Sequence, residues 1–161
     1  RAIRESGMVE FEKLVIKKDE KVWSIIVDIY PINDDGNLID ASTLGAVAAL
    51  KDAVLPELDE DLRPNYEKKT NKKLPLSKET APLSFSFFKL GESIILDPTR
   101  EEEEASDTRI TFGIARWKDQ YMISSCQKKG EAPLTKEEIK EIMNLIPKKF
   151  DELNKKLKNF L

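Results

Sequence analysis

The chain has 161 residues, of which 40% are hydrophobic and 35% charged, with 27 Lys and Arg residues against 30 Asp and Glu residues. This length suits one domain with its own hydrophobic core. The formal net charge of −3 argues against a strongly basic nucleic-acid-binding domain. Because the chain contains no histidine, Ser-His-Asp and Cys-His catalytic arrangements and ordinary zinc sites are excluded within it.

Cys126 is the one cysteine, so no internal disulfide can form, and we expect a reducing, cytoplasmic location. No apolar run reaches the roughly 20 residues that a membrane-spanning helix needs. The first residues lack the basic and then apolar pattern of a signal peptide. Since the chain begins at Arg1 within a helix-like stretch, we expect a piece of a longer polypeptide that does not associate with membranes.

In the first half of the chain, residues 1–11 are predicted to be the end of a helix that breaks near Gly7, and residues 14–16 a short strand. The β-branched and aromatic run at residues 22–30 predicts a buried strand. Residues 38–55 are predicted to form a helix that can approach a sheet or another subunit closely, because one face carries small residues: Ala41, Gly45, Ala48, Ala49 and Ala53. The polar, proline-containing stretch 57–82 predicts a long surface loop.

The second half alternates as antiparallel strands do, with predicted hairpins at 83–96 and 108–128. Thr135 and Glu138 have the spacing of a capping box, which marks the start of a C-terminal helix. Pro147 is expected to kink or interrupt that helix. The sequence therefore predicts an α+β domain in which a small-residue helix and a C-terminal helix pack on a largely antiparallel or mixed sheet.

Several strings in this order resemble the RNase PH family, and in particular the C-terminal portion of the non-catalytic ring subunit of archaeal exosomes. They are residues 1–6, 13–16, 27–31, 36–41, 48–53 and 96–103. The resemblance implies that residues 1–16 are a remnant of a preceding RNase PH-type domain and its connector. It also implies that residues 17–161 form an RNase PH-type C-terminal domain.

The same resemblance implies a ring of alternating catalytic and non-catalytic subunits in which phosphate attacks the RNA 3′ end. Catalytic relatives hold that phosphate with a Gly-Gly-Thr-Arg-like stretch before the small-residue helix, where amides and an arginine converge on the anion. Here the matching turn reads Asp35-Gly36-Asn37-Leu38, so that Leu38 stands where the arginine would be and Asp35 repels phosphate. We therefore expect no catalytic residue, no cofactor and no metal in this chain.

Arg1 and Arg4 are the residues expected to contact RNA, because they lie one helical turn apart and can meet one phosphate track. The alternative is that both are solvated or pair with acidic groups. The expected function is a scaffold and RNA-positioning subunit in 3′-to-5′ RNA degradation. The expected partners are a catalytic RNase PH-type subunit in a hetero-oligomeric ring, single-stranded RNA and an RNA-binding cap protein.

Two other functions stay open at this point. The chain could be an independently active phosphorolytic exoribonuclease that uses Asp97 and Asp107 with a divalent metal, or a protein-interaction domain without an RNA role. The acidic run 101–104 could hold Mg²⁺, but a solvated loop or a helix N-terminus is the favoured interpretation. Trp23, Trp117 and Cys126 are expected to be packing residues.

Overall fold

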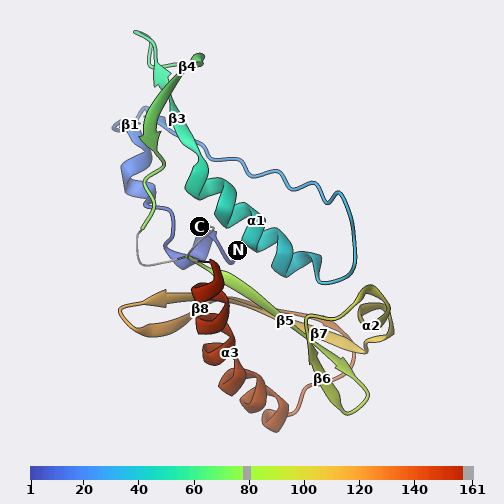
Figure 1. Ribbon diagram of the computed structural model, residues 1–161. Helices are drawn as coiled ribbons and strands as arrows, with labels where there is room; N and C mark the ends of the chain where they lie inside the picture. Colours follow the sequence, from blue (N-terminus) through green and yellow to red (C-terminus); the bar gives the residue numbers. More distant parts are fainter. Residues whose placement is uncertain (78–80, 158–161) are drawn as a thin grey trace.

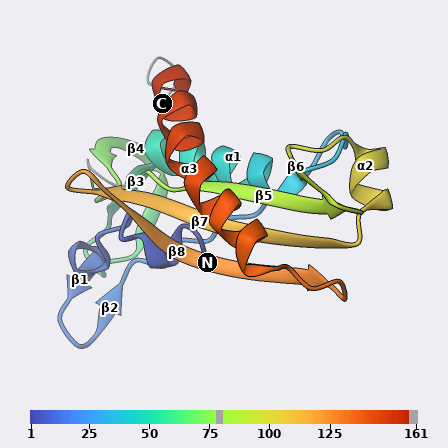
Figure 2. The same ribbon diagram turned by 90° about the horizontal axis from the view of Figure 1, so that it is seen from below.

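The computed structural model describes residues 1–77 and 81–157 and has an α+β architecture. A four-stranded antiparallel sheet in the order β6-β5-β7-β8 lies at its centre. Helix α3 (Lys136–Leu157) covers one face of this sheet, and helix α1 (Leu38–Asp52) lies on the other (Figures 1 and 2). The short helix α2 (Arg100–Ala105) connects β6 to β7. The strands are β5 (Leu83–Leu90), β6 (Ser93–Leu96), β7 (Thr108–Trp117) and β8 (Gln120–Gly130).

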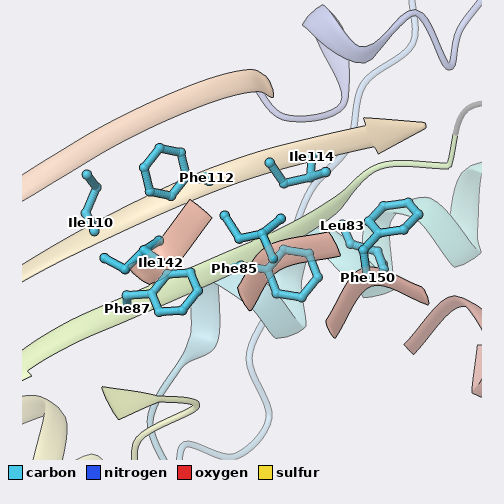
Figure 3. Close-up of a cluster of buried hydrophobic side chains, with 9 residues drawn as sticks. Leu83, Phe85, Phe87, Ile110, Phe112, Ile114, Ile142 and Phe150 are labelled. Atoms are coloured by element: carbon cyan, nitrogen blue, oxygen red, sulfur yellow. The ribbon is translucent and has the colours of Figure 1, made fainter. Parts of the chain in front are cut away.

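The main hydrophobic core lies between the sheet and α3 (Figure 3). Alternation along β5 and β7 turns one set of side chains toward α3, where apolar residues of the helix meet them. The ring centroids of Phe85 and Phe150 lie 6.4 Å apart in this layer. The buried set is Leu83, Phe85, Phe87, Ile110, Phe112, Ile114, Ile142, Ile146 and Phe150. Both predicted hairpins and the C-terminal helix are therefore confirmed.

The start of α3 is fixed by its predicted capping box. Thr135 N–H donates to Glu138 Oε2 at 2.6 Å, and Glu138 N–H donates to Thr135 Oγ1 at 3.1 Å. Glu138 Oε1 also lies 2.7 Å from Nζ of Lys89 on β5, and this contact is the main reason that the pKa of Glu138 falls below its ordinary value. The helix continues across Pro147, so the predicted interruption does not occur.

The junction between α1 and the sheet is polar rather than apolar. Asp40 Oδ2 accepts a hydrogen bond from the backbone N–H of Ser86 at 2.8 Å, and Asp40 Oδ1 accepts one from Ser86 Oγ at 2.8 Å. Strand β6 ends at Leu96, which pairs with Phe87, so β6 has no residue opposite Ser86. The Asp40 carboxylate accepts the hydrogen bond from the Ser86 amide instead. Burial raises the pKa of Asp40 above its ordinary value. One turn further, Thr43 Oγ1 and Ser84 Oγ lie 2.8 Å apart.

The N-terminal residues form two 3₁₀ turns, η1 (Arg4–Ser6) and η2 (Phe11–Leu14), instead of the predicted helix end. Turn η1 lies against the sheet, where Ser124 Oγ of β8 donates to Ala2 O at 3.0 Å. A Cβ atom at Gly113 of β7 would lie 2.7 Å from Ala2 Cβ. A glycine is thus required at this point for η1 to approach the sheet so closely.

The expected surface loop at residues 57–82 is wrong for most of its length. Strand β3 (Val54–Leu58) pairs antiparallel with β4 (Pro64–Lys73) in a hairpin that extends away from the central sheet (Figure 1). A smaller hairpin of β1 (Val15–Lys17) and β2 (Lys21–Val22) is joined to it by a hydrogen bond from Lys21 Nζ to Asp61 O. Polar composition misled the prediction, because a hairpin with two solvated faces needs few apolar residues. Residues 78–80 of that stretch lie outside the described part of the chain.

The predicted buried strand at residues 22–30 is also wrong, since of these residues only Val22 belongs to a strand, the last residue of β2. Residues 23–32 run alongside α1 without joining a sheet (Figure 1). Ile25 packs against a second, smaller core of Met8, Val47 and Leu50. Cys126 is likewise not a core residue, because it is exposed on the edge strand β8.

Asp40→Ala should lower the free energy of unfolding by about 1–3 kcal/mol, because the fully buried Ser86 would lose the acceptor of its backbone amide. Chemical denaturation at pH 7 measures this loss. Asp52→Ala is the matched control on the same helix, since the Asp52 side chain is 96% exposed, and it should cost less than about 0.5 kcal/mol. Equal losses for the two variants would contradict the role given to Asp40.

The stability contributed by Asp40 should also depend on pH. Its folded-state pKa lies above the ordinary value of 3.8, so the proton-linked part of its contribution is fully present below pH 3.8 and is lost as the pH rises through the folded-state pKa. The hydrogen bonds to Ser86 contribute in addition and remain at pH 7. The difference in unfolding free energy between the natural chain and Asp40→Asn should therefore fall with rising pH across that window and then level off. A difference that rises there would contradict the raised pKa.

Candidate functional site

The turn that precedes α1 is packed directly against the chain between β6 and α2. Gly36 has a positive φ of 87°, and a Cβ atom there would lie 2.7 Å from Pro98 O. Asn37 adopts the left-handed conformation with φ 50° and is 9% exposed. Its Nδ2 donates to Asp97 Oδ1 at 2.9 Å. The turn and Asp97 thus form one contact region at the N-terminus of α1.

Carboxylates of the chain itself occupy the amides of this turn. The backbone N–H of Gly36 donates to Asp34 Oδ1 at 3.0 Å, and that of Asn37 donates to Glu103 Oε2 at 2.8 Å. An incoming phosphate would have to displace both carboxylates to reach these two donors. Leu38, in the position expected for the phosphate-binding arginine, supplies no charge.

A cavity of about 210 Å³ opens beside the turn. Three carboxylates and two guanidinium groups line it, so its lining has no excess of positive charge to hold a multiply charged anion. Arg100 Nε lies 3.0 Å from Glu104 Oε1 and is neutralised there. The Nε atom of Arg109 is buried and makes no hydrogen bond within the described residues. The charged lining residues are Asp34, Arg100, Glu103, Glu104 and Arg109.

Asp97 and Asp107 are not brought together as a catalytic pair. The register of β5 with its neighbours places Asp97 just beyond Leu96, which pairs with Phe87, and Asp107 just before Thr108, which pairs with Lys89. The two aspartates therefore lie about four residues apart along β5, or about 13 Å, on opposite sides of that strand. Asp107 Oδ2 instead accepts a hydrogen bond from Gly91 N–H at 3.1 Å in the β5–β6 turn.

The acidic run at residues 101–104 forms most of α2. Thr99 caps this helix in a capping box with Glu102, and Glu103 binds the turn amide of Asn37. These carboxylates therefore stabilise the helix start and the turn, in line with the favoured interpretation. Within residues 1–77 and 81–157, no cluster of three acidic or cysteine side chains has the arrangement of a metal site.

Arg1 and Arg4 are both exposed and lie on the same N-terminal turn. The backbone N–H of Glu5 donates to Arg1 O at 2.9 Å, which closes the turn, and Arg4 Nε lies 2.8 Å from Glu5 Oε1. Arg1 also borders a surface hollow lined by Leu38 and Ile39, at the first turn of α1. The structure thus places residues 1–5, called the arginine turn below, next to the N-terminus of α1.

The sequence did not predict the contacts that three residues make at this site. Asp34 could have been found, since an aspartate two residues before a glycine in a turn often accepts the glycine amide. Glu103 and Asp40 could not, because their partners Asn37 and Ser86 are 66 and 46 residues away. Only the folded chain brings these groups together.

Two family models match the chain. The model of the 3′ exoribonuclease family, domain 1, matches residues 1–56, and that of domain 2 of the same family matches residues 80–145. The domain 1 match extends past residues 16 and 17, where the sequence predicts the boundary, so the position of the boundary stays a prediction. Within the described residues, no helix is long and apolar enough to cross a membrane.

Curated relatives and solved structures of archaeal exosomes resemble the chain over most of its length. Exosome complex component Rrp42 of Methanosarcina acetivorans is 35% identical over 95% of this chain and 53% of the relative. The protein of the same name from Methanothermobacter thermautotrophicus is 36% identical over 95% of this chain and 55% of the relative. A chain in the Archaeoglobus fulgidus exosome with RNA bound to the active site superposes with a TM-score of 0.83 at 35% identity, over 98% of this chain and 58% of that chain.

The chain therefore spans about half the length of the curated relatives that it matches. Both halves of the match point to the same family, in the order domain 1 and then domain 2. The fold and the identity to the solved exosome chain agree with that assignment. The chain belongs to the 3′ exoribonuclease, or RNase PH, family.

Proposed function

We propose that this chain is a non-catalytic scaffold and RNA-positioning component of an exosome ring, in which a catalytic RNase PH-type partner degrades RNA by 3′-to-5′ phosphorolysis. Relatives that share 35–36% of its residues are named exosome components, and a structural match comes from an exosome with RNA bound. Single-stranded RNA and an RNA-binding cap protein are the further partners in this proposal.

One observation carries the non-catalytic part of the proposal. The amides of Gly36 and Asn37, at the turn where the family resemblance expects the attacking phosphate, already donate to Asp34 and Glu103. Phosphate would meet negative charge instead of convergent donors, and transition-state charge on a phosphoryl group would lack stabilisation. The wide separation of Asp97 from Asp107 argues in the same way against an independent enzyme.

The exposed arginine turn supports the RNA-positioning part. Arg1 and Arg4 project from a short turn whose backbone is held on β8, so the turn is anchored to the sheet while both side chains stay exposed. The Arg1 side chain has no ion-pair partner within the described residues, and the Arg4 partner, Glu5, is itself half exposed. Such a pair can exchange water and a weak surface ion pair for RNA phosphate at little cost.

The chain alone should not shorten an end-labelled single-stranded RNA in the presence of phosphate, because the Gly36 and Asn37 amides of the turn before α1 are already occupied. Adding it to a catalytic RNase PH-type subunit should raise the rate of shortening above that of the partner alone. Gel analysis of the labelled RNA measures both rates. Phosphate-dependent degradation by the chain alone would overturn the non-catalytic assignment.

Charge reversal of the arginine turn should weaken RNA binding by the assembly of the chain with its catalytic partner. For the double variant Arg1→Glu and Arg4→Glu, we expect at least about a tenfold loss of affinity and a salt dependence reduced by about two ions, one for each lost phosphate contact. Fluorescence anisotropy at several stated salt concentrations measures both quantities.

The matched control is the double variant Lys17→Glu and Lys18→Glu, which makes the same change in net charge at exposed positions of the β1–β2 hairpin. It should leave the affinity within about twofold of the natural chain. Equal losses in the two double variants would show only a general charge effect. An unchanged affinity in the arginine variant would favour a protein-interaction domain without an RNA role.

A further inference from the structure

Arg109 is a cation without a partner at the wall of a cavity. Its side chain extends from β7, is partly buried and lines the cavity of about 210 Å³ beside the turn before α1. The Nε atom is buried and makes no hydrogen bond, and no ion pair joins the guanidinium group to any of residues 1–77 and 81–157. An unpaired buried donor is unfavourable. The guanidinium group therefore needs an acceptor that this part of the chain does not supply.

The carboxylates that line the same cavity are engaged elsewhere. Asp34 and Glu103 each accept a hydrogen bond from a backbone amide of the turn before α1. Glu104 pairs with Arg100 at 3.0 Å. None of these three carboxylates forms an ion pair with Arg109, although all of them border the same space. Of the charged groups around the cavity, Arg109 is thus the one that has no counter-ion or hydrogen-bond partner in the described chain.

A second cation lies directly beside Arg109. In the pairing of β7 with β8, Arg109 is opposite Lys129, so both side chains leave the sheet on the same face. Lys129 is exposed, and its Nζ atom makes no ion pair or hydrogen bond with the residues that the structure describes. Like charges in directly opposite positions destabilise a strand pair. An anion bound by both cations would remove this repulsion.

The face of the sheet that carries Arg109 also carries the arginine turn. Arg109, Thr111 and Gly113 alternate with core residues along β7 and so share one face. Ala2 of the arginine turn rests on Gly113, since a Cβ atom at that glycine would lie 2.7 Å from Ala2 Cβ. Gly113 is four residues from Arg109, or about 13 Å along the strand. A protein that contacts the arginine turn from this side can therefore also reach Arg109.

The size and charge of the cavity favour a single carboxylate as the missing anion. At about 210 Å³, the cavity is smaller than the roughly 300–1,000 Å³ of pockets for drug-sized ligands, so it admits one side chain or one small group. An RNA phosphate would bring neighbouring phosphates with it, and the three lining carboxylates would repel them. A carboxylate adds one negative charge, and its two oxygens match the paired N–H donors of a guanidinium group.

We propose that Arg109, together with Lys129, is a docking site for one Asp or Glu side chain of the catalytic RNase PH-type subunit. The acidic side chain enters the cavity, pairs with the Arg109 guanidinium group and neutralises the two adjacent cations. This inference rests on the proposed function, because the arginine turn can present RNA to the catalytic subunit only if the two proteins meet near this face. It gives their contact one specific ion pair, at a place that RNA does not occupy.

Arg109→Met should change stability and binding in opposite directions. In the chain alone, the variant removes an unpaired buried donor, so the midpoint of chemical denaturation should rise. Its affinity for the catalytic subunit without RNA should fall at least about tenfold, because the carboxylate of the partner loses its counter-ion. Isothermal titration calorimetry at a stated salt concentration measures the affinity. A lower denaturation midpoint would contradict the unpaired state of the guanidinium group.

An exposed position tests the same site without disturbing the fold. Lys129→Glu should weaken binding to the catalytic subunit at least about fivefold. The matched control is Lys128→Glu, which makes the same change in charge at the neighbouring exposed residue. Lys128 pairs with the core residue Ile110, so its side chain lies on the other face of the sheet. The control should bind within about twofold of the natural chain, and both variants should keep its circular dichroism spectrum.

Exchange of the two charges identifies the acidic partner residue. Arg109→Glu should lose affinity for the catalytic subunit. In a scan that changes each exposed Asp or Glu of the catalytic subunit to Arg, one variant should bind Arg109→Glu more tightly than it binds the natural chain. A complete scan without such a variant would contradict a direct ion pair.

Three further outcomes would overturn the proposal. The first is an unchanged affinity for the catalytic subunit in both Arg109→Met and Lys129→Glu. The second is an equal loss in Lys129→Glu and Lys128→Glu, which would show only a general charge effect. The third is an Arg109→Met chain that loses affinity for RNA but not for the catalytic subunit, because the occupant would then be RNA phosphate. In all three the natural chain still binds the catalytic subunit. A natural chain that does not bind it would overturn the proposed function as well.

Discussion

The contact between Asp40 and Ser86 is the constraint on which the arrangement of this molecule depends. Strand β6 is too short to pair with the whole of β5, and the free amide that it leaves at Ser86 is satisfied by a carboxylate from the first turn of α1. This contact fixes the height and rotation of α1 over the sheet. The preceding turn is then held against the chain between β6 and α2, where Asn37 meets Asp97. A buried carboxylate without hydrogen-bond donors would be unfavourable. Helix α1 must therefore lie where Asp40 reaches the donors of Ser86.

The same geometry explains why we propose that this site does not catalyse phosphorolysis. Bringing the α1 turn close to α2 places Glu103 within reach of the Asn37 amide, and a carboxylate takes up a donor that an anionic substrate would need. Helix N-termini attract anions in general. Here the anion is part of the protein. What distinguishes this turn from a phosphate site is thus the supply of internal acceptors as much as the missing arginine.

Local patterns predicted the elements whose partners are close in sequence or whose apolar faces are regular. The hairpins of β5 with β6 and of β7 with β8, and the capped α3, belong to this group, and their regular apolar faces form the main core. The prediction for residues 22–30 failed because a strand is defined by its neighbours, and beyond Val22 no described strand pairs with this run. The prediction of a loop where the β3–β4 hairpin forms failed for the opposite reason, since the strands of that hairpin pair without needing an apolar face. The contacts of Asp40 and Glu103 were beyond prediction because they join distant parts of the chain.

The glycine at position 113 has a consequence for the order in which the molecule acquires its parts. Turn η1 rests on β7 and β8, and its contact from Ala2 to Ser124 spans 122 residues of sequence. Closing so long a loop is unfavourable until the local hairpins have formed, so the turn docks late in folding. These residues are synthesised before β8, but the surface on which they rest is complete only once β8 has been made. We therefore expect Arg1 and Arg4 to reach their positions only after synthesis has passed β8. The two arginines are then in place only when the domain is fully folded.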